Sequence, residues 1–407
     1  MLRSILTAYR EAFAGLNRSV WLLSLATLVN RSGTMVLPFL VLYLVKMRGF
    51  ETTEAGAAIG LYGAGGVLGS YLGGWLCDRM APRWVIAGSL SLTGVGFIVL
   101  GRLAAHPAIF ITMVLLGLVG EGFRPATSTA LAAAAPPELR TRAFALNRLA
   151  VNVGMSFGPS VGGFLAMRSY DWLFIVDGGT CLLAAAFLVV AFHGGTARAE
   201  KPEVAAVPGR SPWTDGPFLV MMGLFFLLAL VTFQMVSTFG LTLRDLYGLQ
   251  EGRIGLVMAV NTVLIVVFEM ILVHRVGALN PVRLVGLGGF LFGLGFAMLP
   301  FGSTFVYAMC AAVVWTIGEM LSFPLAAGVV ANRAGDANRG VYMGLFTISF
   351  EGAWIFSPIL GTWIYQTWGP RTLWLGCGAV GLVLLVGFQA VAAWIERERK
   401  TVYSSPS

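Results

Sequence analysis

Twelve stretches of mostly apolar residues constrain the fold of this chain more than any other feature. A helix needs about 20 apolar residues to cross the hydrocarbon core of a bilayer. Of the 407 residues, 57% are hydrophobic and only 11% are charged, so lipid must solvate most of the surface. Because unpaired backbone groups cannot face lipid, we predict that every stretch is a helix. The stretches lie near 20–45, 54–76, 84–103, 108–133, 143–166, 171–192, 217–243, 253–274, 284–301, 304–331, 341–365 and 372–395.

A polar segment divides these stretches into two sets of six. Residues 193–216 are rich in Pro, Gly and charge, which is typical of a linker. The sequence therefore predicts an all-α membrane protein with twelve transmembrane helices in two pseudo-symmetric bundles, residues 1–192 and 217–407, the latter with a short cytoplasmic tail. Features recur at one constant spacing in the two halves: Gly56 and Gly255, Pro125 and Pro324, Arg140 and Arg339, Pro159 and Pro358, Gly162 and Gly361.

The basic residues indicate topology rather than a nucleic-acid partner. The net charge is +8, and most Arg and Lys residues fall in the loops on the side of both termini. The positive-inside rule places that side, and the predicted linker, in the cytoplasm of a bacterial inner membrane. Anionic lipid is the expected partner of these loops, and no nucleic acid is expected.

The loop after the second stretch reads GGWLCDRMAPR at residues 73–83. It resembles the signature loop of the major facilitator superfamily, although Ala81 and Pro82 depart from the pattern. The resemblance implies the major facilitator fold and a latch on the cytoplasmic side. In that latch a carboxylate sits at the positive end of the eleventh helix, which is expected to begin near Gly340. The matching residues are Gly74, Leu76, Asp78, Arg79 and Arg83, of which Asp78, Arg79 and Arg83 are the expected gating residues.

The fifth stretch contains a glycine pattern, GxxxGPxxGG, at residues 154–163. It resembles a motif of proton-coupled antiporters in the same superfamily. Glycines four residues apart form a flat face on which another helix can pack closely, and a proline inside the helix bends it. The resemblance implies antiport, although the fourth stretch lacks the early Arg that such antiporters carry. The expected gating residues here are Gly154, Gly158, Pro159 and Gly162.

Charged residues inside the predicted spans are candidates for function, because a charge at the bilayer centre costs at least ~2.5–3.5 kcal/mol. Glu121 and Arg124 are three residues apart and can pair on one helical face. Glu319 and Glu351 have no cation in the membrane portion of their own half, so they are expected to load and release protons. An alternative is that they pair with arginines of the other half. The predicted proton-coupling residues are Glu319, Glu351 and Glu121.

Further polar and aromatic residues on the same stretches are expected to line a substrate cavity. Asp177 is expected to make a structural hydrogen bond, and Glu269 lies close enough to the interface to extend its carboxyl there. The predicted substrate-binding residues are Arg31, Asn30, Arg124, Arg148, Asn152, Gln234, Asn261, Trp315 and Trp354.

Together these features predict a proton-coupled secondary active transporter that works by alternating access and exports amphipathic compounds or drugs by antiport, as in multidrug efflux. The alternative is proton-coupled transport of an organic anion, which three arginines within the spans would favour. The sequence contains no HExxH motif, no nucleophile motif and no P-loop, so neither an enzyme nor a direct use of ATP is expected. We expect no metal and no cofactor. The expected partners are a small-molecule substrate, protons and membrane lipid, and the expected state is a monomer.

Overall fold

The computed structural model describes residues 15–136, 139–192, 211–276, 279–334 and 339–404. Every regular element in these ranges is a helix. Contacts divide the chain into two compact units. Unit 1 is Met1–Phe50 with Leu61–Pro202, and unit 2 is Glu51–Gly60 with Glu203–Ser407. The predicted linker lies mostly outside the described residues, so the boundaries of the two halves stay a prediction.

Ten described segments are long and apolar enough to cross a membrane. The segment Val341–Glu398 contains the last two predicted spans, because the helix breaks at Gly369, which has a φ of 83°. The second predicted span corresponds to a 26-residue helix, Thr52–Cys77, which is not among these ten segments. The predicted all-α membrane fold is confirmed.

Unit 1 is built from helices whose buried faces are small and aliphatic. One core joins Val20, Ile86, Ala126, Leu146 and Ala185 from five different helices. Large apolar side chains on the outward faces, such as Val190 at 69% exposure, are suited to lipid. The helices are α2 (Arg18–Ser32), α3 (Val36–Arg48), α4 (Thr52–Cys77), α5 (Pro82–Arg102), α6 (His106–Gly120), α7 (Phe123–Ala134), α8 (Arg140–Arg168) and α9 (Asp171–Ala191). Of α4, the residues up to Gly60 are counted with unit 2.

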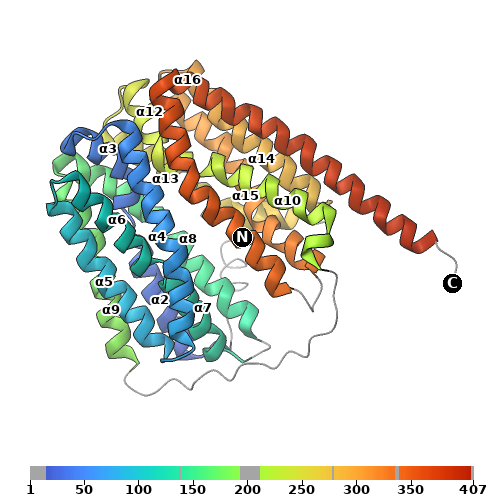
Figure 1. The fold of residues 1–407 in the computed structure, drawn as a ribbon, viewed down its shortest axis with the longest axis horizontal. Coiled ribbons are helices and arrows are strands. Elements are labelled where there is room, and N and C mark those ends of the chain that lie inside the picture. The colour runs from blue at the N-terminus through green and yellow to red at the C-terminus, as the bar shows by residue number, and fades with distance from the viewer. Residues whose placement is uncertain (1–14, 137–138, 193–210, 277–278, 335–338, 405–407) are drawn as a thin grey trace. The chain divides into compact units, whose positions relative to one another are not determined.

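Unit 2 has a more aromatic core, in which Phe218, Phe225, Leu384 and Phe388 are fully buried. Figure 1 shows the last helix running through this unit and turning back at its break toward the C-terminus. The elements are η2 (Pro212–Thr214), α10 (Gly216–Thr232), α11 (Gln234–Ser237), α12 (Phe239–Asp245), α13 (Glu251–Val276), α14 (Pro281–Met298), η3 (Leu299–Phe301), α15 (Phe305–Ala334) and α16 (Arg339–Ser404).

Three predicted spans are broken helices rather than continuous ones. The first is divided into α2 and α3 near Gly33, and the fourth into α6 and α7 at Glu121 and Gly122. The seventh is divided into α10, α11 and α12. In the first span, the N–H groups that open α3 have no helical partner inside the membrane and must find another acceptor.

Candidate functional site

Glu121 lies at the junction of α6 and α7, where the backbone keeps right-handed helical angles (φ −76°, ψ −12°). Its Oε2 is 3.0 Å from Nε of Arg124, so the ion pair predicted from the three-residue spacing is present. Tyr62, on α4, donates its hydroxyl to Oε1 at 3.3 Å. Sequence analysis did not identify Tyr62, because its partner is 59 positions away and no local pattern marks it. The Glu121 side chain is 16% exposed and that of Arg124 is 57% exposed.

Arg31 belongs to the same electrostatic cluster in unit 1. It lies in the last turn of α2 and interacts with the charges of Glu121 and Arg124. Its guanidinium carbon is 5.8 Å from the ring centroid of Phe123, close enough for a cation–π contact. Its Nε is buried, and no acceptor for it is present among the described residues. A cation in the membrane thus retains one donor that no atom of the described residues satisfies.

Asn30, the neighbour of Arg31, is directed toward another helix. Its Nδ2 donates to Sγ of Cys181 on α9 at 3.2 Å. In this arrangement Asn30 fastens the end of α2 to α9. Its predicted contact with substrate therefore requires a change in this hydrogen bond.

Asp177, a buried carboxylate on α9, caps the break in the first span. Its Oδ2 accepts the backbone N–H groups of Met35 and Val36, both at 3.0 Å. These amides open α3 and have no partner in the helix, so the carboxylate supplies the missing acceptor. The structural hydrogen bond predicted for Asp177 is confirmed.

The glycines of the fifth span form the surface on which this broken first span rests. A Cβ built on Gly154 would lie 2.6 Å from the Cβ of Arg31, and one on Gly158 would lie 2.3 Å from the carbonyl oxygen of Thr34. Gly162 continues the stripe beside Met35 at 3.1 Å. The close helix approach predicted from the motif is therefore present, and Pro159 lies within α8 as expected.

In unit 2, Glu319 occupies the middle of the 30-residue helix α15. Its Oε2 accepts a hydrogen bond of 2.7 Å from Nδ2 of Asn261 on α13. Nδ2 of Asn261 also lies 3.2 Å from Oγ1 of Thr316, one turn before Glu319. Among the described residues no cation pairs with Glu319, and the charged group that acts on it is the carboxylate of Glu269. This leaves a carboxyl group in the membrane held by an amide.

Gln234 begins the short helix α11 in the seventh span and makes hydrogen bonds through both atoms of its amide group. It is buried, and its Nε2 donates to the backbone oxygen and the hydroxyl of Ser357 at 2.9 Å each. Its Oε1 accepts from Oγ1 of Thr238 at 2.9 Å. Gln234 thus joins α11 to α16 and satisfies polar groups at the break.

The two tryptophans proposed as cavity walls have different surroundings. Trp315 is fully buried, with ring centroids 5.7 Å from Phe292 and 5.8 Å from Phe296. It is therefore part of the core of unit 2, which differs from the place expected for a residue beside substrate. Trp354 is partly buried and meets Phe233 edge to face at 4.5 Å.

The remaining predicted residues of the spans lie on α8 and α16. Arg148 is exposed and Asn152 is partly buried, one turn apart on α8. Glu351 is partly buried in the first half of α16, before the break. Their roles stay predictions.

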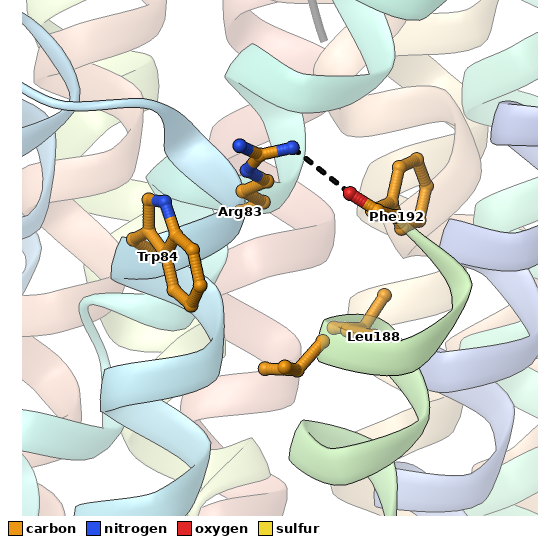
Figure 2. A pocket seen from close by; sticks show the side chains of 5 residues that line it. Arg83, Trp84, Leu188 and Phe192 are labelled. Atoms are coloured by element: carbon orange, nitrogen blue, oxygen red, sulfur yellow. Dashed lines mark hydrogen bonds between the residues drawn. The ribbon is translucent and has the colours of Figure 1, made fainter. Parts of the chain in front are cut away.

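The signature loop follows the end of α4. Arg79 stacks on Trp75 at 3.6 Å and donates to its backbone oxygen, while Asp78 is exposed. Arg83 reaches α9, where its Nη1 donates to the backbone oxygen of Phe192 at 2.9 Å (Figure 2). In unit 1, then, Arg83 caps the C-terminal end of a neighbouring helix. The predicted latch is not tested by these contacts.

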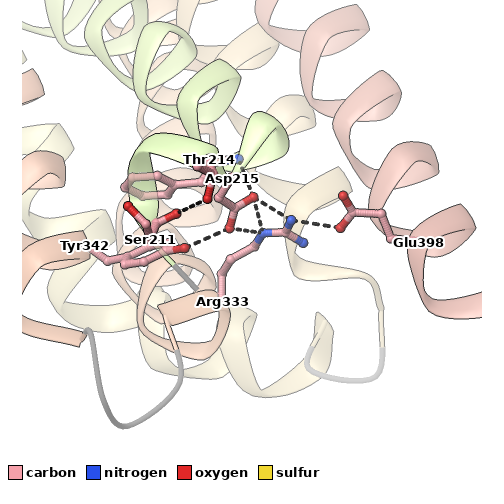
Figure 3. A network of polar contacts seen from close by, with 7 residues as sticks. Ser211, Thr214, Asp215, Arg333, Tyr342 and Glu398 are labelled. Carbon is pink, nitrogen blue, oxygen red and sulfur yellow. Dashed lines mark hydrogen bonds and ion pairs between the residues drawn. The ribbon is translucent and has the colours of Figure 1, made fainter. Parts of the chain in front are cut away.

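A buried ion-pair network, which sequence analysis missed, ties the helix ends of unit 2 together (Figure 3). Asp215 caps α10 and accepts hydrogen bonds of 2.6–3.1 Å from Arg333 of α15 and of 3.0 Å from Tyr342 of α16. Arg333 also pairs with Glu398 at 2.9 Å. Burial alone would raise the pKa of Asp215. The hydrogen bonds and the charge of Arg333, together with the other donors, lower the pKa by more than burial raises it, so the pKa lies below the ordinary 3.8.

Long apolar helices, with charged side chains held between them, define a polytopic membrane protein whose polar sites lie within its spans. A family model described as Major Facilitator Superfamily matches residues 22–358. The chain belongs to the Major Facilitator Superfamily of transporters.

Similar proteins support the same assignment. The chain is 24% identical to the "Uncharacterized MFS-type transporter YqjV" of Bacillus subtilis, covering 84% of both chains. It is 21% identical to a "Na(+), Li(+), K(+)/H(+) antiporter" of Planococcus maritimus, covering 88% of this chain and 89% of that one. It is 22% identical to "Multidrug resistance protein 2" of Bacillus subtilis, covering 81% and 82%.

A solved structure shares the fold at low sequence identity. The crystal structure of a POT family transporter in complex with a thioalcohol-conjugated peptide superposes with a TM-score of 0.79 at 15% identity, covering 95% of this chain and 98% of that one. The likeness confirms the major facilitator fold.

Proposed function

We propose that this protein is a proton-coupled secondary active transporter that exports amphipathic organic compounds by antiport. The observation that carries the proposal is Glu319, a carboxyl group in the middle of a membrane helix with an amide partner and no cation among the described residues. A buried charge without a counter-ion is costly, whereas the neutral acid is tolerated. A carboxyl in this setting favours a proton when it is sealed in protein and releases it when water reaches it.

The names of two relatives agree with this proposal. One relative is described as a cation/proton antiporter and another as a multidrug resistance protein. The glycine stripe of α8, which resembles an antiporter motif, packs on α2 in the structure. We place the protein in a bacterial inner membrane as a monomer, with both termini in the cytoplasm.

We propose the following roles for individual residues. Glu319 carries the proton, with Glu351 and Glu121 as further coupling groups. The proposed substrate-binding residues are Arg31, Arg124, Arg148, Asn152 and Trp354, with Asn30, Gln234 and Asn261 holding the polar framework around the sites. Gly154, Gly158, Pro159 and Gly162 are proposed to permit the movement of α8, and Asp78, Arg79 and Arg83 to control one end of the pathway.

Reconstitution into proteoliposomes tests the coupling. Ethidium is the drug-like probe, and pyranine trapped inside the vesicles reports the proton. We expect a pH gradient to drive ethidium uphill and ethidium to drive proton release. Glu319→Gln is expected to retain downhill ethidium movement and to lose both coupled signals. Glu396→Gln, which alters an exposed carboxylate of unit 2, is the matched control. Full coupling in Glu319→Gln would contradict the assignment.

A second candidate function is transport of an organic anion, and Arg31 favours it. The buried Nε of Arg31 has no acceptor among the described residues, and a carboxylate or phosphate would supply one. Carboxyfluorescein is the corresponding probe in the same vesicles. If carboxyfluorescein but not ethidium moves against its gradient with protons, the anion function replaces the drug function.

A further inference from the structure

A small cavity lies in unit 1 at the membrane boundary where α5 begins and α9 ends. Its volume is about 130 Å³, the space of about four waters. The lining residues come from the first turn of α5 and the last turn of α9, and Figure 2 shows them facing one another. They are Arg83, Trp84, Leu188, Val189 and Phe192.

The cavity has one charged group, the guanidinium of Arg83. One nitrogen donates to the backbone oxygen of Phe192 at 2.9 Å. The Nε of the same guanidinium is buried and has no acceptor among the described residues. A guanidinium has five N–H donors, and the carbonyl end of a helix offsets only about half a unit charge. Because no acidic side chain lines the cavity, a net positive charge and an unsatisfied donor remain.

The walls of the cavity are apolar and open toward the lipid-facing surface. Trp84 is 50% exposed and Val189 is 40% exposed, next to the still more exposed Val190. The guanidinium also lies 5.4 Å from the ring of Trp84. Tryptophan side chains of this kind are enriched at the level of lipid headgroups. A ligand that satisfies both parts of this surface carries an anionic group close to an apolar chain.

We propose that this cavity binds the phosphate of an anionic phospholipid. The phosphate accepts hydrogen bonds from the guanidinium of Arg83, and the glycerol and first acyl carbons lie against Trp84 and Val189. A soluble phosphate would meet the same guanidinium, but it would gain nothing from the apolar wall. This lipid site lies apart from the groups proposed to carry the proton and the substrate, although Arg83 is also a proposed gating residue. Failure of the lipid proposal would therefore not contradict proton-coupled transport.

Lipid binding to the delipidated full-length protein tests the proposal. Phosphatidylglycerol, phosphatidylcholine and inorganic phosphate are titrated separately, and bound adducts are counted by native mass spectrometry. We expect preferential binding of phosphatidylglycerol. Arg83→Gln removes the charge and is expected to weaken this binding about five-fold, the effect of one arginine near an anionic surface. Arg83→Lys is expected to retain part of the preference.

Two further variants make the result specific. Arg102→Gln alters an exposed arginine at the opposite end of α5 and is expected to leave the binding unchanged. Val189→Asp leaves Arg83 in place and adds a carboxylate to the wall, and it is expected to lower phosphatidylglycerol binding even if Arg83→Gln folds poorly. Equal phosphatidylglycerol binding in wild type, Arg83→Gln and Val189→Asp would overturn the proposal. Inorganic phosphate that binds as tightly as the lipid would also overturn it, in favour of a soluble anion.

Discussion

Gly154 lies directly against Arg31, with only 2.6 Å between the Cβ of the arginine and the position that a Cβ on residue 154 would take. The glycine motif and the buried cation are therefore parts of one arrangement. The absence of a side chain on α8 allows α2 to approach closely, and that approach fixes the position from which the guanidinium extends. A change in the packing of α8 would move the charge.

Gly158→Ala is expected to destabilise the protein by about 1–3 kcal/mol, the usual cost of an extra methyl group in a filled space. The new Cβ would lie 2.3 Å from the carbonyl oxygen of Thr34, which is backbone and cannot rotate away. Thermal unfolding in detergent, followed by tryptophan fluorescence, gives the shift in Tm. Gly179→Ala on α9 is the control, because no atom lies within 4 Å of its added Cβ. Equal Tm values for the two variants would show that the stripe is not tightly packed.

Arg31→Gln is expected to weaken the binding of carboxyfluorescein at least ten-fold if the anion function holds, because a charge-assisted hydrogen bond is worth about 1.5–3 kcal/mol. Arg31→Lys keeps the charge but not the planar group, so its Kd for carboxyfluorescein should lie between those of wild type and Arg31→Gln. Isothermal titration without any pH gradient measures binding apart from coupling. An unchanged Kd in Arg31→Gln would remove Arg31 from the substrate site.

Asp177→Leu is expected to lower the stability of unit 1. It leaves the N–H groups of Met35 and Val36 without an acceptor inside the membrane, at a cost of about 1–3 kcal/mol per group. Asp177→Asn retains an acceptor oxygen and should cost less. Asp171→Leu, on the exposed first turn of the same helix, should lose at most a helix-dipole contribution of about 0.3–1 kcal/mol. The Tm values of the three variants are compared in one detergent, and Asp177→Leu should have the lowest. A Tm for Asp177→Leu above those of the other two variants would contradict the capping role.

Asp215→Asn is expected to reduce stability at neutral pH and to do so less in acid. The pKa of Asp215 is lower in the folded protein than its ordinary 3.8. The contribution of Asp215 to the free energy of unfolding is therefore present above pH 3.8. It is lost as the pH falls through the lower pKa that Asp215 has in the folded protein. The Tm difference between wild type and Asp215→Asn should shrink below about pH 4.

The control for this pH dependence is the exposed pair of Arg283 and Glu396, whose side chains are 47% and 46% exposed. Glu396→Gln should change Tm little at any pH, because exposed ion pairs contribute about 0–1 kcal/mol. A Tm difference for Asp215→Asn that stays constant from pH 7 to pH 3 would show that the carboxylate charge does not stabilise the network.

Features set by local spacing could be predicted from the sequence. Glu121 and Arg124 pair because residues three apart share one face of a helix. The glycines of α8 align for the same reason. The count and length of apolar stretches sufficed for the all-α membrane fold, since lipid allows few other solutions.

Features that depend on distant partners could not be predicted. Asp177 was expected to make a structural hydrogen bond, but its acceptance of amides 142 and 141 positions away depends on how α9 packs on the broken first span. Asp215 and Arg333 are 118 positions apart, and each alone has the pattern of an ordinary loop or interface charge. The breaks themselves were missed because a hydropathy pattern continues across a turn as easily as across a helix.

The cap on α3 gives the first span a built-in spectroscopic reporter. The amides of Met35 and Val36 bond to a side chain instead of to the preceding helical turn, so their hydrogen–deuterium exchange depends on the carboxylate and on water entry at that depth. The exchange rates of these two amides would therefore report how often water enters the first span at the depth of Met35 and Val36.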